Sequence, residues 1–105
     1  MGDGDGDWDW DGPGADRVSL FSMSDLTLKL REAVSHALAG DWEKAHLIVQ
    51  DHDENRIANW IHAIVHRMEG DLGNARYWYG RSGRELREGL STSDELEEVR
   101  AALDH

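Results

Sequence analysis

The sequence predicts an all-α protein with two tandem antiparallel helical hairpins and a C-terminal helix. Three observations support this fold class. Apolar residues recur with the three- and four-residue spacing of amphipathic helices from about residue 24 onward. A glycine followed by an aspartate interrupts this pattern twice, at Gly40–Asp41 and at Gly70–Asp71. The segments around the two interruptions also match each other at an offset of 30 residues.

The first hairpin is expected over residues 24–50. Its first helix begins near Ser24 or Asp25, either of which can cap a helix start, and it runs to Ala39. Gly40 ends this helix, and Asp41 caps a second one. The apolar face of the first helix carries Leu26, Leu30, Ala33, Val34 and Ala37. The corresponding face of the second helix carries Trp42, Ala45, His46 and Val49.

The second hairpin is expected over residues 56–83. Its first helix spans about Arg56 to Glu69, after which Gly70 ends the helix and Asp71 caps the returning one. The returning helix should end near Gly80 or Gly83, because each glycine destabilises a helix interior by ~1 kcal/mol relative to alanine. The apolar faces of these two helices carry Ile57, Trp60, Ile61, Ile64, Val65 and Met68, and then Leu72, Ala75 and Tyr79.

A last helix is expected over residues 93–104. Thr92 and Glu95 have the spacing of a capping box at its start. Its apolar residues, with those just before it, would suit either of two roles: covering the open apolar end of the hairpins, or forming a homodimer interface. These residues are Leu86, Leu90, Leu96, Val99 and Leu103.

The two matching segments share the pattern A-x6-G-D-x3-A, formed by Ala33, Gly40, Asp41 and Ala45 and repeated from Ala63. In a helical hairpin, such alanines let the backbones approach, the glycine adopts a left-handed turn and the aspartate caps the returning helix. This pattern resembles the tetratricopeptide repeat, although its period is 30 residues rather than 34. The resemblance implies stacked hairpins that bind a protein or peptide. The longer segment WIHAIVHRMEGDLGNARYWYGRSGR is also similar to a family of small bacterial helical proteins with no assigned function.

Composition is that of one small domain without a membrane span. The chain has 105 residues, no cysteine and a formal charge of −11, so disulfides and thiolate chemistry are excluded. The negative charge disfavours nucleic acid and anionic membranes as partners. Residues 1–16 hold six aspartates and no basic residue, which predicts a disordered acidic tail ahead of one helical domain over residues 17–105. With no apolar run of membrane-spanning length and no signal peptide, a cytoplasmic protein is expected.

One helix face carries candidate metal ligands. His62 and His66 form an H-x3-H motif, so they lie one turn apart on the same face, and Glu69 follows close to the same side. Two imidazoles and a carboxylate at this spacing can hold zinc or another divalent ion. The alternative is a polar or interface face without a metal. No motif indicates any other cofactor.

Aromatic and arginine side chains are concentrated in NARYWYGRSGR, residues 74–84. Such a composition is typical of protein-interface anchors, although some of these rings can equally belong to the core. The predicted partner-binding surface consists of His62, His66, Tyr77, Trp78, Arg81 and Arg84. The predicted function is therefore a protein- or peptide-binding module, with a metal- or small-ligand-binding protein as the alternative.

The acidic tail raises two further hypotheses. DWDWDG, residues 7–12, has the carboxylate spacing of the first half of a calcium loop, but Val18 stands where a bidentate glutamate is needed. The tail could also dock on Arg81 and Arg84, or serve solubility alone. The chain has no phosphate-binding loop, no nucleophile elbow and no acid-base pair that defines a catalytic site, so an enzyme is not predicted.

Overall fold

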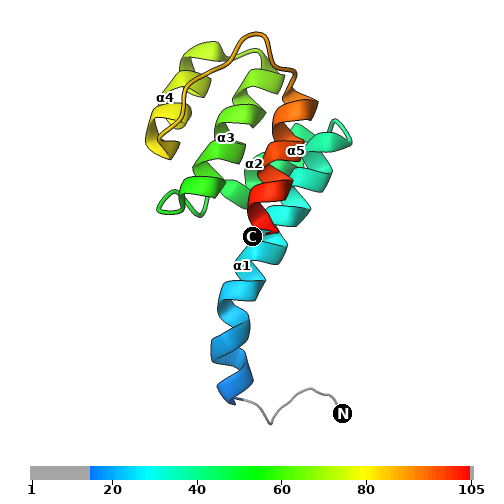
Figure 1. The fold of residues 1–105 in the computed structure, drawn as a ribbon, viewed down its shortest axis with the longest axis vertical. Helices are drawn as coiled ribbons and strands as arrows, with labels where there is room; N and C mark the ends of the chain where they lie inside the picture. Colours follow the sequence, from blue (N-terminus) through cyan, green and yellow to red (C-terminus); the bar gives the residue numbers. More distant parts are fainter. Residues whose placement is uncertain (1–14, 105) are drawn as a thin grey trace.

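The computed structural model describes the backbone of residues 15–104 and the side chains of residues 25–104. This part of the chain contains helices and no strands (Figure 1), which confirms the predicted all-α fold. The DWDWDG segment and the rest of residues 1–14 lie outside it. The helices, in chain order, are α1 (Ala15–Leu38), α2 (Trp42–Val49), α3 (Arg56–Glu69), α4 (Leu72–Ser82) and α5 (Thr92–Leu103).

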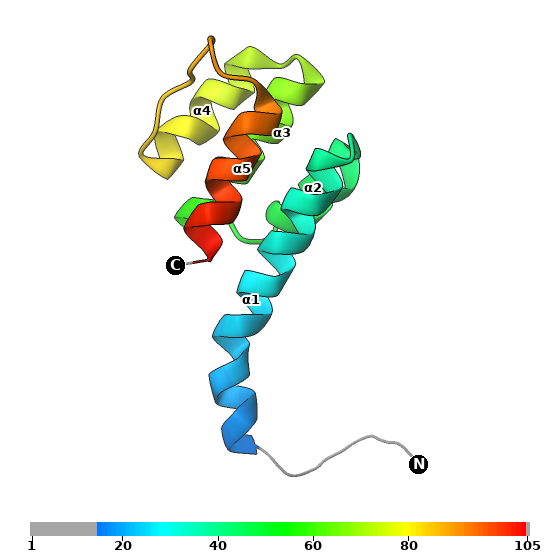
Figure 2. The same cartoon turned by 45° about the vertical axis from the view of Figure 1, so that its right-hand side comes forward.

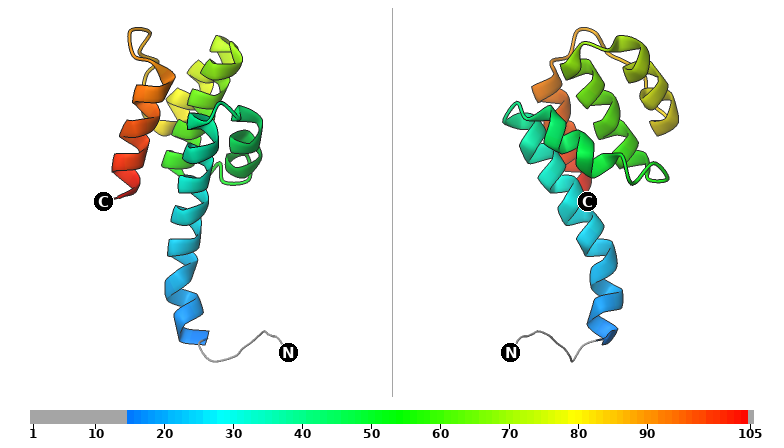
Figure 3. Two further views of the ribbon diagram at one scale, coloured as in Figure 1. Left: turned by 90° about the vertical axis from the view of Figure 1, so that its right-hand side faces the viewer. Right: turned by 180° about the vertical axis from the view of Figure 1, so that it is seen from behind.

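The first helix begins earlier than the sequence pattern predicted. α1 starts at Ala15, whereas the prediction placed its start near Ser24 and assigned residues up to Asp16 to the tail. The physical reason is that no glycine or proline occurs between Ala15 and Gly40, so nothing in that segment stops a helix. The first half of α1 extends beyond the other helices (Figures 1 and 3). Although α1 has 24 residues, no helix in the described range is long and apolar enough to cross a membrane.

The two glycine-aspartate turns have the same backbone geometry, in agreement with the repeat. Gly40 and Gly70 adopt the left-handed conformation, with φ of 87° and 90°. In each turn the amide of the aspartate donates to the carbonyl oxygen five residues earlier, at 2.8 Å, which closes a Schellman motif. The carboxylates of Asp41 and Asp71 then accept hydrogen bonds from backbone amides in the first turns of α2 and α4. The two matching sequence segments therefore form the same turn and the same helix cap.

The two hairpins lie side by side, and α5 covers the first helix of each. α1 packs against α2, α3 packs against α4, and α2 contacts α3. α5 packs on both α1 and α3 (Figure 2), with Leu96 and Val99 buried. Of the two roles expected for the last helix, these contacts fit the covering of the hairpins; the homodimer interface stays a prediction. In the described structure the backbones of α2 and α4 do not contact each other. Between them, His46 of α2 and Trp78 of α4 lie against His62 of α3.

α3 is the central helix of the fold. It contacts α1, α2, α4 and α5, and all of its residues from 58 to 65 are buried. The buried stretch includes the polar residues Asn59 and His62. Asn59 donates from Nδ2 to the backbone carbonyl of Asp53 at 2.9 Å. His62 lies on the side of α3 flanked by α2 and α4, so the face that the sequence allowed to be exposed is closed. Leu72, predicted on the inward face of α4, is instead exposed.

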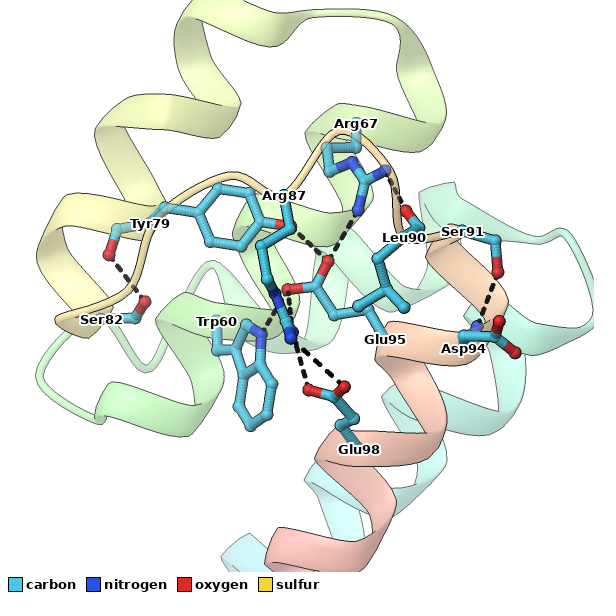
Figure 4. A network of polar contacts seen from close by, with 10 residues as sticks. All are labelled: Trp60, Arg67, Tyr79, Ser82, Arg87, Leu90, Ser91, Asp94, Glu95 and Glu98. Carbon is cyan, nitrogen blue, oxygen red and sulfur yellow. Dashed lines mark hydrogen bonds and ion pairs between the residues drawn. The ribbon is translucent and has the colours of Figure 1, made fainter.

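Glu95 of α5 is the centre of a buried polar network (Figure 4). The sequence predicted a capping box with Thr92, but Ser91 caps α5, because its Oγ accepts a hydrogen bond from the Asp94 amide at 3.0 Å. The fully buried Glu95 carboxylate instead joins three helices and the loop before α5. It accepts hydrogen bonds from Trp60 Nε1 (2.7 Å), Arg67 (2.7 Å) and the Tyr79 hydroxyl (2.6 Å), and it lies 3.8 Å from Arg87.

Candidate metal-binding site

Three imidazoles gather between α2 and α3. His46 comes from α2, and His62 and His66 come from consecutive turns of α3. The centroid of the His46 ring lies 4.7 Å from that of His62 and 5.6 Å from that of His66, and both contacts are edge to face. The rings of His62 and His66 are stacked, with centroids 5.0 Å apart and an interplanar angle of 19°. No two of the three rings share a hydrogen bond in the described structure.

Local sequence patterns place each ring. The H-x3-H spacing puts His62 and His66 one above the other on α3. His46 lies four residues after Trp42, on the face of α2 that packs against α3. Ala45 and Val49 on the same face are fully buried, so α2 sits close to α3 and brings the His46 ring to the other two.

The nitrogen atoms of this cluster are close enough for one ion. One ligand atom from each ring lies within 4.8 Å of the other two. In a tetrahedral zinc site, with Zn–N bonds of about 2.0–2.1 Å, two ligand nitrogens lie about 3.3 Å apart. Binding of one ion would bring the three nitrogens to this spacing. Three imidazoles without a thiolate suit zinc, copper or nickel.

Glu69 orients one of the three rings. Its carboxylate lies 2.8 Å from Nδ1 of His66. A carboxylate on one ring nitrogen fixes the tautomer and leaves the other nitrogen, Nε2, as the metal ligand, an arrangement common in metalloproteins. Glu69 and Asp71 also form a second acidic grouping around His66, but the Asp71 oxygens accept hydrogen bonds from the backbone and side-chain amides of Asn74. Glu69 thus contacts His66 and also belongs to this second group.

His62 is held as a neutral ring with an unused nitrogen. It is 4 % exposed, and burial together with the nearby His46 and His66 rings lowers its pKa to about 4. Its Nδ1 atom is buried and has no hydrogen-bond partner. Burial and His66 also lower the pKa of His46. Neutral imidazoles are the form that binds metals, so protons compete little with an ion for His62 at neutral pH.

Aromatic side chains of α4 enclose the cluster on one side. The Trp78 ring stacks on His62 with centroids 3.9 Å apart and an interplanar angle of 13°. Tyr77, which is 56 % exposed, meets Trp78 edge to face at 5.1 Å. The Arg81 guanidinium lies over the Trp78 ring, 5.4 Å from its centroid, and donates to the backbone carbonyl of Asp53 at 3.1 Å. Trp78 thus separates His62 from the exposed surface of α4.

The structure brings together most of the predicted site residues. His62, His66, Tyr77, Trp78 and Arg81 lie in one region between α2, α3 and α4. Arg84 lies elsewhere: its guanidinium is stacked 3.6 Å above the Trp60 ring, on the side of α3 that faces Glu95.

The structure adds His46 to the predicted pair His62 and His66, and it places the Glu69 carboxylate beside His66 Nδ1. The position of His46 on the inward face of the helix preceding H-x3-H was the available sequence signal.

The comparison of this chain with protein-family models, curated proteins and solved structures found no match.

Proposed function

We propose that this protein binds a divalent transition-metal ion through His46, His62 and His66. The observation that carries the proposal is the convergence of three imidazoles from two helices, with ligand atoms mutually within 4.8 Å. A buried polar atom without a partner costs about 1–3 kcal/mol, and an ion bound at His62 Nδ1 would supply that partner. Metal binding would offset that cost and would join α2 to α3.

Zinc is the ion we assign to the site. Zinc accepts imidazole nitrogens without a geometric preference of its own, and three histidines form a known zinc ligand set in proteins. Copper binds most nitrogen sites more tightly, so availability decides which ion occupies such a site in a cell. The absence of cysteine in the sequence leaves imidazole and oxygen as the available donors.

The direct test is calorimetric titration of zinc into chelator-treated protein without a histidine tag. We expect one zinc ion per chain. His46→Ala should weaken binding by about 100-fold or more, since even the loss of an outer hydrogen-bond partner of a ligand costs 10–100-fold. His46 is partly exposed, so this variant should fold, which circular dichroism would verify.

His52→Ala is the matched control, because His52 is a partly exposed histidine that belongs to no metal-binding group among the described residues. It should bind zinc like the wild type. Equal retention in both variants would show that the ion binds elsewhere, for instance to the aspartates of residues 3–11, and equal weakening would show that the effect is not specific to the cluster.

Protein or peptide binding is a second candidate function. The observation that favours it is the exposed Tyr77 ring beside Trp78 and Arg81 on α4, since tyrosine, tryptophan and arginine are enriched at interface anchors. A pull-down from lysate should recover a protein with the wild type and lose it with Tyr77→Ala. Leu28→Ala, which removes an equally exposed apolar side chain from α1, is the control and should retain it.

A further inference from the structure

The donor set of the site contains three protein atoms. Within the described residues, no carboxylate belongs to the group formed by His46, His62 and His66. The nearest acidic partner, Glu69, contacts Nδ1 of His66. Zinc and cobalt(II) sites with nitrogen donors are usually four-coordinate, so three imidazoles leave one position for a ligand from outside this set.

The remaining position faces the solvent side of the cluster. His62 is 4 % exposed and is covered by Trp78, so it lies on the side of the cluster that faces the protein interior. His46 and His66 are both partly exposed and lie on the opposite side of the cluster. An ion bound to all three rings therefore lies between Trp78-covered His62 and the partly exposed rings of His46 and His66. A solvent-facing position on a three-histidine metal ion is an exchangeable one.

The ion itself attracts an anion at this position. Three neutral imidazoles leave its two positive charges in place, while Glu69 contacts a ring of the cluster and Asp71 lies within 4.8 Å of His66 and Glu69. Arg81 adds a further positive charge on the α4 side, over Trp78. Trp78 and the exposed Tyr77 present aromatic carbon beside the site, which suits the carbon skeleton of an organic anion.

We infer that the ion held by His46, His62 and His66 keeps one solvent-facing coordination position and binds a carboxylate there. This inference rests on the proposed metal-binding function. The carboxylate can belong to a small free acid or to an acidic side chain of a peptide, and both sources offer the same oxygen donors. The first source makes the protein a receptor for a small acid, and the second uses the metal as the anchor of a peptide complex.

Cobalt(II) substitution tests the inference, because the visible absorption of cobalt(II) reports its coordination. Chelator-treated full-length protein would be loaded with one equivalent of cobalt(II) and titrated with acetate, with perchlorate at equal ionic strength as the control. We expect a saturable change in the cobalt bands with acetate and none with perchlorate. Arg81→Ala should weaken acetate binding about two- to five-fold, the range for an exposed charge.

A second arm separates the two sources. An acetylated and amidated tripeptide with a central aspartate carries one carboxylate and no free terminus. Tighter binding of this peptide than of acetate assigns the position to a protein or peptide, and equal or weaker binding assigns it to a small acid. Either result supports a carboxylate-binding position.

Three results would overturn parts of this picture distinctly. If cobalt(II) does not bind, the proposed metal function itself fails. If cobalt(II) binds with a four-coordinate spectrum that acetate does not change, the site is closed and the inference fails while the metal function stands. If cobalt(II) converts the protein to a dimer, a second copy supplies the fourth ligand, and the open position is likewise excluded.

Discussion

Two polar clusters lie on opposite sides of α3, and they differ in how completely their atoms are hydrogen-bonded. Trp60 and Arg67 are seven residues apart and point to one side, toward Glu95, whereas His62 and His66 point to the other. Both oxygens of Glu95 have partners, and Arg67 also donates to a backbone carbonyl in the loop before α5. On the opposite side His62 Nδ1 is buried without a partner.

This difference separates a structural network from a ligand site. Buried polar groups that are fully paired rigidify a fold and specify one packing arrangement. The Tyr79 hydroxyl fits this role, because burial and its hydrogen bond to Glu95 raise the pKa of Tyr79 and keep it a proton donor. Unpaired polar atoms in a buried cluster call for a partner, such as a water or an ion. We therefore regard the Glu95 network as the device that fixes α5 on α3, and the histidine cluster as the proposed site for a ligand.

The largest expected loss of stability comes from disrupting the fully hydrogen-bonded cluster around Glu95. Glu95→Ala removes the acceptor of Trp60, Tyr79 and Arg67 and leaves the mostly buried Arg67 charge without its partner. Loss of one member of a buried ion pair costs about 3–5 kcal/mol, so we expect that decrease in the free energy of unfolding, measured with urea. Glu95→Gln should lose less, because it keeps the shape and one acceptor oxygen.

Glu97→Ala is the control for this prediction. Glu97 lies on the exposed face of the same helix, paired with Arg100, so its loss should change the free energy of unfolding by no more than about 0.5 kcal/mol. Similar stability of the Glu95 and Glu97 variants would show that the network does not hold α5 in place.

The next effect is that of zinc on stability. An ion that binds only the folded state at a hundred times its dissociation constant stabilises it by about 2.7 kcal/mol. We expect a zinc-dependent rise of this size in the wild type and in Glu97→Ala, measured by thermal or urea unfolding. In His46→Ala, where binding is about 100-fold weaker, the rise should fall to about 0.4 kcal/mol or less, because one of the three ligands is gone. An equal rise in that variant would contradict the assignment of the ion to this cluster.

The part of this picture that the sequence predicted is the part set by local signals. Gly40 and Gly70 end helices because only a residue without a side chain adopts their left-handed backbone readily, and Asp41 and Asp71 cap because their carboxylates reach the next amides. Such signals need a few neighbouring residues. The two hairpin turns follow from them, whereas the start of α1 at Ala15 does not.

The features that the sequence did not predict depend on which helices pack against each other. His46 joins His62 because α2 packs against α3, and Glu95 becomes a buried hub because α5 crosses the Trp60 side of α3. In the sequence Glu95 has the spacing of a cap residue, and nothing local distinguishes a capping glutamate from one that turns into the core. Arg84 was grouped with Trp78 for the same reason, although it stacks on Trp60.

A smaller effect on metal affinity is expected from a change at Glu69, whose carboxylate contacts His66. Glu69→Gln keeps the shape of the side chain but removes the charge beside His66 Nδ1. Loss of such an outer partner typically weakens metal binding by 10–100-fold, which calorimetry or competition with a chelator would measure. Glu43→Gln, on the exposed side of α2, is the control and should bind zinc like the wild type. Unchanged affinity in Glu69→Gln would show that Glu69 does not orient a ligand.

The smallest effect on the free energy of unfolding is expected from a change at His62, and it should be a gain where Glu95→Ala gives a loss. It is the sharpest test of the difference between the paired and the unpaired cluster. His62→Phe replaces a buried ring with an unpaired nitrogen by an apolar ring of similar shape, still stacked on Trp78. Removing an unsatisfied polar atom is neutral or favourable, so the metal-free variant should match the wild type or exceed its stability by up to about 1 kcal/mol.

Trp60→Phe introduces the same residue on the other side of α3, where it removes a donor to Glu95 and leaves a void, and it should cost about 1–3 kcal/mol. Urea unfolding with a chelator present compares the two. If His62→Phe loses as much stability as Trp60→Phe, the histidine cluster is as structural as the Glu95 network, and the distinction between paired and unpaired clusters does not hold in this fold.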